Sequence, residues 1–152
     1  MEYYKRYNEA RKGSRGKEQQ MRLRVHHLLC IPLYVGHGYG DAFCQNMERV
    51  IEKLKEGRDE LLTVVCEADM ICEGCPNLTE YGVCRMGGTS VEEKDRRLAE
   101  NLGIQPKRQY TCAQLFEIAR KKLNGQIFET SCRNCEWFGK GLCTYEKWRE
   151  SV

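Results

Sequence analysis

The sequence has no run of apolar residues long enough to cross a membrane, which requires roughly 20 in succession. Its longest apolar stretch, residues 28–35, is short and is interrupted by Pro32. The first thirty residues contain no apolar segment of the kind found in secretory leaders. We therefore expect a protein that binds no membrane and resides in the cytoplasm.

Cysteine, in contrast, is abundant: the 152 residues include ten cysteines. In a reducing cytoplasm structural disulfides are rare, and clustered cysteines more often bind metal. The alternative is a secreted disulfide scaffold whose leader has been removed. The chain is longer and less rich in cysteine than such scaffolds usually are. The sequence therefore predicts a cysteine-ligated metalloprotein.

The net charge of +3 is carried by the first twenty residues, which hold six Lys or Arg against three Glu. Glycine and serine among these basic residues indicate flexibility. We interpret residues 1–20 as a flexible basic extension and residues 21–152 as a single cysteine-rich metal-binding domain. A basic tail could contact nucleic acid, but a solvated extension is the commoner case, so we expect no nucleic-acid partner.

Residue patterns predict an α+β domain, mostly helical, with a small two-stranded sheet and two cysteine-rich metal-binding loops. The predicted strands are residues 21–25 and 61–65. Helical segments are predicted at residues 27–35, 41–56, 90–102, 111–124 and 145–148. Asp41 is the expected N-cap of the second helical segment. Capping boxes are expected at Ser90 with Glu93 and at Thr111 with Gln114.

Two segments share one cysteine pattern, in which a C-x2-C pair is followed by glycine, an apolar residue and a third cysteine. The two triplets are Cys72, Cys75, Cys84 and Cys132, Cys135, Cys143. A C-x2-C pair places two thiolates on one turn, within reach of one metal or one cluster. The glycine lets the backbone fold back towards the site. A redox-active pair usually opens a helix in a βαβ unit, which the sequence does not indicate here.

The number of cysteines in each loop favours an iron–sulfur cluster over a zinc ion. Structural zinc sites commonly combine two pairs of ligands, whereas each loop here supplies three cysteines and needs a fourth partner. Pro76 directly follows Cys75, as in ferredoxin-type motifs. We therefore predict an iron–sulfur cluster of the 4Fe–4S type, with zinc as the alternative.

Cys30 is the natural additional ligand, and His26 lies four residues before it, on the same side of a helical turn. Imidazole can bind iron or zinc, or can transfer protons at neutral pH. We predict His26 as a metal ligand, whereas His27 could equally be a core residue. The seven cysteines of the predicted site leave open whether one cluster or two are bound. Cys44 and Cys112 suit apolar packing, and Cys66 is a reserve ligand.

A resemblance supports this interpretation. The motifs that carry it are Arg24-Val25-His26-His27-Leu28-Leu29-Cys30, Gly36-His37-Gly38-Tyr39, Ile71-Cys72-x2-Cys75-Pro76, Gly82-Val83-Cys84 and Cys132-x2-Cys135-Glu136-Trp137. In this order, over residues 21–145, the chain resembles a bacterial and archaeal family known as domain of unknown function 1284. Its members are suggested to bind iron–sulfur clusters, so the resemblance implies metal binding without an established activity. Val25 stands where the family tends to have proline.

Three functions remain open at this point. The first is an iron–sulfur protein with a structural or redox role, the latter requiring a redox partner. The second is an enzyme whose cluster leaves one iron open, with His26 or His27 as acid or base. The third is a zinc-stabilised binding module, in which the basic tail contacts nucleic acid.

Overall fold

The computed structural model describes residues 21–152 except 37, 86–88 and 134, so the predicted basic extension lies outside the described residues. The described residues contain a three-stranded sheet with strand order β1-β2-β3. Strand β1 (Met21–Arg24) pairs in parallel with β2 (Leu61–Val65), and β3 (Gln109–Thr111) pairs with β2 in the antiparallel sense. The prediction of an α+β fold that is mostly helical is confirmed.

The prediction of two strands is wrong, because β3 adds a third. This strand is only three residues long, and none of its side chains is fully buried. It therefore lacks the apolar alternation by which strands are predicted. Its last residue, Thr111, also caps the next helix, so the helix signal obscured the strand.

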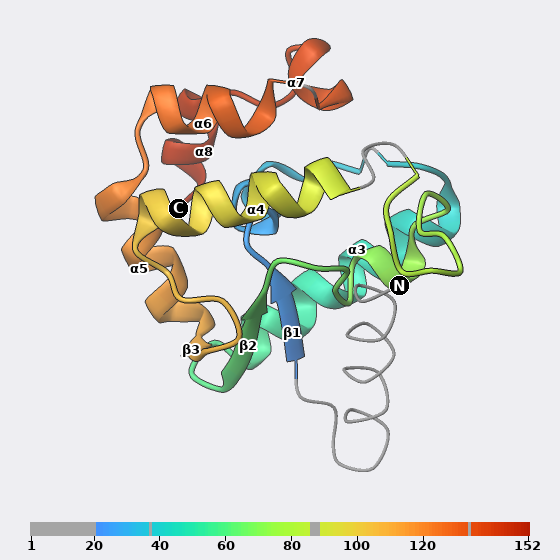
Figure 1. Cartoon of the computed structure of the whole chain (residues 1–152), viewed down its shortest axis with the longest axis horizontal. Helices are drawn as coiled ribbons and strands as arrows, with labels where there is room; N and C mark the ends of the chain where they lie inside the picture. Colours follow the sequence, from blue (N-terminus) through green and yellow to red (C-terminus); the bar gives the residue numbers. More distant parts are fainter. Residues whose placement is uncertain (1–20, 37, 86–88, 134) are drawn as a thin grey trace.

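Seven α-helices occur in the described residues (Figure 1). They are α2 (His27–Cys30), α3 (Asp41–Glu56), α4 (Thr89–Leu102), α5 (Cys112–Lys122), α6 (Gly125–Cys132), α7 (Glu136–Gly139) and α8 (Tyr145–Ser151). Two short 3-10 turns, η1 (Ile31–Leu33) and η2 (Cys72–Gly74), complete the set. No helix in the described part of the chain combines the length and apolar character that crossing a membrane requires.

The predicted helix 41–56 matches α3, but its cap differs from the prediction. Gly40 occupies the N-cap position, and Asp41 is the first helical residue, where a carboxylate interacts favourably with the helix dipole. Met47, Val50 and Leu54 form the buried face, as their spacing predicts.

Between β3 and the second cysteine loop the chain forms two helices, whereas the sequence predicts one. The capping box of Thr111 and Gln114 opens α5 as predicted. A second helix, α6, then begins at Gly125, where the side-chain oxygen of Asn124 accepts a hydrogen bond from the N–H of Ile127 (2.8 Å). The Ser90 side chain is outside the described residues, so the other capping box is untested.

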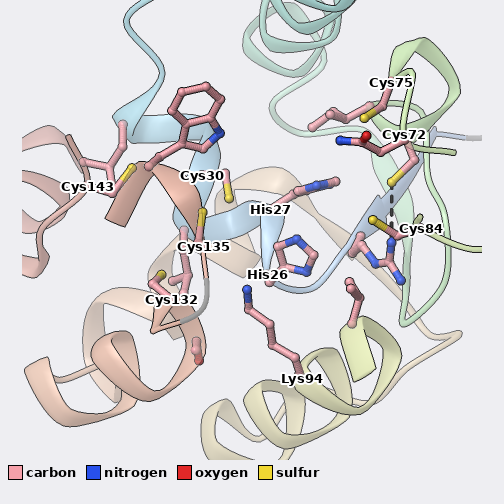
Figure 2. A pocket seen from close by; sticks show the side chains of 18 of the residues that line it. His26, His27, Cys30, Cys72, Cys75, Cys84, Lys94, Cys132, Cys135 and Cys143 are labelled. Atoms are coloured by element: carbon pink, nitrogen blue, oxygen red, sulfur yellow. Dashed lines mark hydrogen bonds between the residues drawn. The ribbon is translucent and has the colours of Figure 1, made fainter. Parts of the chain in front are cut away.

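The short helix α2 holds a central position because the C-terminal helix anchors it. The indole Nε1 of Trp148, in α8, donates a hydrogen bond to the Leu28 carbonyl (3.0 Å). Leu28 and Leu29 are fully buried in the same core. Helix α4 contacts both α5 and α6, and Figure 1 shows it crossing between the sheet and the C-terminal helices. His27 and Cys30, at the two ends of α2, lie between the two groups of loop cysteines (Figure 2).

Candidate metal centre

All seven predicted ligand cysteines line one cavity of about 1030 Å³. They are Cys30, Cys72, Cys75, Cys84, Cys132, Cys135 and Cys143. His26 and His27 line it as well. The remaining cysteines, at positions 44, 66 and 112, are not among the described residues of its lining. The structure thus gathers the residues that sequence reasoning selected and separates them from the three cysteines assigned to packing or reserve.

The two cysteine loops have the same backbone design. In each C-x2-C pair the second N–H donates to the first carbonyl, at 2.9 Å for Cys75 to Cys72 and 2.8 Å for Cys135 to Cys132. The glycine before each third cysteine is left-handed, with φ of 76° at Gly82 and 74° at Gly141. Such values favour glycine, because a Cβ atom is sterically strained at a positive φ. These φ values agree with the prediction that each glycine lets the backbone turn, and the metal site itself stays a prediction.

Four thiols gather on one side of the cavity: Cys30, Cys132, Cys135 and Cys143, the four-thiol group (Figure 2). They come from α2, the end of α6, the turn before α7 and the segment before α8. Burial raises the pKa of the Cys30 thiol well above its usual value, and the charges of the other three thiols raise it further. Burial likewise raises the pKa of Cys132 to about 12.

A cation faces the four-thiol group. The ammonium of Lys94, on α4, lowers the pKa of Cys30 and Cys132, against the larger effect of burial. Figure 2 shows the Lys94 side chain pointing into the space beside His26. A positive charge at this position would stabilise thiolates bound to a metal.

The other three thiols, Cys72, Cys75 and Cys84, form the three-thiol group on the opposite side of the view (Figure 2). An isolated antiparallel bridge between Leu78 and Cys84 closes their loop. Burial raises the pKa of Cys75, and the charge of Cys84 adds to the effect. Arg24 Nη1 donates a hydrogen bond to the Cys72 sulfur at 3.5 Å.

Two buried carboxylates orient the two histidines. Asp69 Oδ2 lies 2.7 Å from His27 Nδ1, and Asp95 Oδ1 lies 2.7 Å from His26 Nδ1. Burial alone would raise the pKa of each carboxyl, but the interactions with its histidine and with N–H donors lower it below its usual range. Because an ionised carboxylate can only accept, each Nδ1 carries the hydrogen, which leaves Nε2 of each ring as the free ligand atom or base.

Arg24, at the end of β1, binds both of these carboxylates. Its Nε donates to Asp95 Oδ2 at 2.5 Å, and its backbone N–H donates to Asp69 Oδ2 at 2.7 Å. The backbone N–H of His26 also donates to Asp95, at 2.9 Å. The end of β1 is thereby connected to both carboxylates and, through Cys72, to the three-thiol group.

Sequence reasoning did not select Arg24, Asp69, Asp95 or Lys94. Asp95 lies three and seven residues before the buried Leu98 and Leu102, so an acidic residue shares the apolar face of α4. A charged residue on an apolar helix face, such as Asp95, or in a buried strand, such as Arg24, is a signal by which these two residues could have been selected from the sequence. Lys94 gives no comparable signal.

The spacing of the thiols bears on which metal they could hold. A tetrahedral zinc ion, with Zn–S bonds of about 2.3 Å, holds its sulfurs about 3.8 Å apart. Among the described residues, only His27, Asp69 and Cys72 bring three potential ligand atoms within 4.8 Å of one another. The four-thiol group is therefore more open than a zinc site. In a cubane each thiolate binds a different iron, so its protein sulfurs lie farther apart than those around one zinc ion.

Aromatic side chains form part of the cavity wall. Trp137, two residues after Cys135, lies against Tyr39 with ring centroids 5.5 Å apart. Lys140 places its Nζ 5.2 Å from the centroid of the Trp137 ring. Tyr39 belongs to the glycine-rich segment 36–40, of which residue 37 lies outside the described residues. This segment and the second cysteine loop thus meet at the cavity.

The fold and the site define an α+β protein with a central cavity lined by cysteine. Residues 38–141 match the model of a family described as "Protein of unknown function (DUF1284)", so the chain belongs to this family. The match is shorter than the motif resemblance over residues 21–145, and His26, Cys30 and Cys143 lie outside it. No curated protein and no solved structure matches the chain.

Proposed function

We propose that this protein binds a 4Fe–4S cluster through Cys30, Cys132, Cys135 and Cys143. The observation that carries the proposal is the convergence of four thiols from separate segments on one side of a cavity. Four cysteine thiolates are the usual ligand set of a cubane. The open spacing of these sulfurs favours the cluster over the zinc alternative.

The surroundings of the four-thiol group support the same assignment. Its buried thiols have raised pKa values, so they are poor free nucleophiles. A bound metal supplies the positive charge that deprotonates them. Lys94 adds a cation beside a centre that would carry net negative charge. The role of such a cluster is structural or redox. A redox role requires an electron-transfer partner, and we propose a cytoplasmic location for the protein.

An enzyme is the second candidate function, favoured by the three-thiol group and His26. Three cysteines would leave one iron of a cubane open to act as a Lewis acid. Burial lowers the pKa of His26 to about 4, so its imidazole is neutral at pH 7 and its Nε2 can accept a proton. This candidate requires that no other residue occupies the fourth position. Cyanide, which binds an open iron, should then shift the electron paramagnetic resonance spectrum, and an unchanged spectrum would exclude the candidate.

Anaerobic purification of the full chain tests the cluster. The protein should be brown, with iron and acid-labile sulfide in near-equal amounts. Cys135→Ser should lose the iron and sulfide of one cluster. Cys44→Ala and Cys66→Ala are matched controls, because neither thiol lines the cavity, and both should retain the full amount. Colourless protein with stoichiometric zinc would overturn the proposal, as would a Cys135→Ser variant with an undiminished cluster.

A further inference from the structure

The three-thiol group has a histidine within reach. A ring nitrogen of His27, the Cys72 sulfur and an Asp69 oxygen all lie within 4.8 Å of one another. We propose that Cys72, Cys75, Cys84 and the imidazole of His27 hold a second iron–sulfur centre, with Asp69 as the residue that positions the imidazole. The inference rests on the proposed function, because it assumes that the cavity takes iron and sulfide.

Asp69 is the positioning residue and not a ligand, since its oxygens are already occupied. Oδ1 accepts the backbone N–H groups of Ile71 (3.0 Å) and Cys72 (3.1 Å). Oδ2 accepts the Arg24 N–H and the His27 Nδ1–H, each at 2.7 Å. A carboxylate has about four acceptor positions, and these four donors fill them. The arrangement is the carboxylate–histidine pair that commonly supports a metal-bound imidazole.

His27 is held rigidly enough to serve as a ligand. It begins α2, is 8% exposed and lines the cavity. With Nδ1 bound to Asp69, the remaining nitrogen, Nε2, is the atom available to iron. In Figure 2 the His27 ring extends towards the side of the cavity that holds Cys72. The fixed tautomer and ring orientation lower the entropic cost of binding a metal.

His26 is not equivalent to His27, although their ring centroids are only 4.5 Å apart. Its carboxylate partner, Asp95, binds the guanidinium of Arg24, whereas Asp69 binds the Arg24 backbone N–H, and His26 is absent from the close group that contains Cys72. The structure therefore assigns the ligand role to the second histidine of the pair. The ligand role of His26 stays a prediction.

The close approach of His27 and Cys72 suggests how the ligands are divided. Because one nitrogen of the His27 ring lies within 4.8 Å of the Cys72 sulfur, this ring and Cys72 would suit a common iron, which leaves Cys75 and Cys84 for another. That division is the one found in 2Fe–2S clusters, where each iron takes two protein ligands. A neutral imidazole in place of a thiolate, together with the Arg24 hydrogen bond to Cys72, would raise the reduction potential of the centre.

Pulsed electron paramagnetic resonance on the reduced full chain tests the imidazole directly. The wild-type protein should show a strong ¹⁴N coupling that changes to ¹⁵N when histidine is isotopically labelled. His27→Gln should abolish this coupling and lower the iron content, whereas the matched control His26→Gln should retain both. His27→Cys should retain iron while losing the nitrogen coupling. This variant keeps the test decisive if His27→Gln fails to fold.

The outcomes separate this inference from the proposed function. Iron that depends on Cys135, without a histidine coupling and without loss in Cys75→Ser, would overturn the second centre and leave the first intact. A coupling that survives in His27→Gln would also overturn the assignment, as would zinc bound at the three-thiol group. Protein without any iron would overturn both proposals.

Discussion

The two cysteine loops share their turns and their left-handed glycine, yet they differ in what completes them. The loop that contains Cys132 and Cys135 faces Cys30, whereas the loop that contains Cys72 faces His27. Both partners lie on α2, three residues apart. A repeated local motif thus places three thiols on each side of the cavity, and one turn of helix between the loops presents a different side chain to each of them.

The loops also differ in their surroundings. Cys132 and Cys143 are buried in the core beside α6 and α8. In contrast, Cys72, Cys75 and Cys84 are half-buried in a segment with one short 3-10 turn and one isolated bridge. A metal bound at the four-thiol group would connect elements of the core, whereas one at the three-thiol group would mainly organise its own loop.

The largest effect should come from removing one ligand on each side. Cys132→Ser should lower the free energy of unfolding by about 3 kcal/mol or more, because metal–ligand bonds contribute to folding free energy. Cys84→Ser should cost clearly less, because its loop is peripheral to the core. Urea unfolding of anaerobic protein, with iron analysis of each variant, measures the difference. Equal losses of stability would show that the two centres are not separate structural units.

Replacing each carboxylate tests whether the two histidines have different roles. Asp69→Asn should weaken iron retention at the three-thiol group by about 10–100-fold, as is typical when the partner of a metal-bound histidine is removed. Asp95→Asn should leave iron retention unchanged and instead lower stability, because Arg24 would lose its buried counter-charge. Iron transfer to a chelator, followed over time, measures retention. The opposite pattern would assign the ligand role to His26.

Helix α2 serves both loops, and Trp148→Phe tests its anchoring. The substitution removes the hydrogen bond to the Leu28 carbonyl and part of a side chain that is 1% exposed. We expect a loss of about 2 kcal/mol, from the hydrogen bond and the space left in the core. Tyr145→Phe, also in α8, is the milder control, since it removes only a half-buried hydrogen bond to Leu123. Thermal unfolding measures both, and equal shifts would contradict the anchoring role.

Much of this arrangement could be predicted from local sequence. Helix α3, strands β1 and β2 and the Thr111 capping box follow from periodicity and capping residues. The cysteine spacing predicted the residues that line the cavity. Strand β3 could not be predicted, because it forms through pairing with β2. Its own residue pattern does not indicate a strand.

The division of the site into two groups was also beyond local sequence. The same triplet occurs twice, and nothing in either one indicates which residue of α2 it faces. Asp69 and Asp95 act through contacts with residues 42 and 69 positions away, His27 and His26 respectively. Such long-range hydrogen bonds depend on how α4 and the segment after β2 pack against α2. These hydrogen bonds can be identified only in the folded structure.

The smallest expected effect concerns the left-handed glycines, and it tests whether the two loops are built alike. Gly141→Ala should cost about 1 kcal/mol, because alanine is strained at a φ of 74° while its added carbon would meet no atom within 4 Å. Gly139→Ala is the matched control, since that position lies in α7, has no positive φ and is equally open. It should be neutral or slightly stabilising. Gly82→Ala should cost at least as much as Gly141→Ala, because Gly82 is also buried. Urea unfolding of the three variants measures these differences. A Gly82→Ala variant as stable as wild type would show that the first loop adopts a different turn from the second.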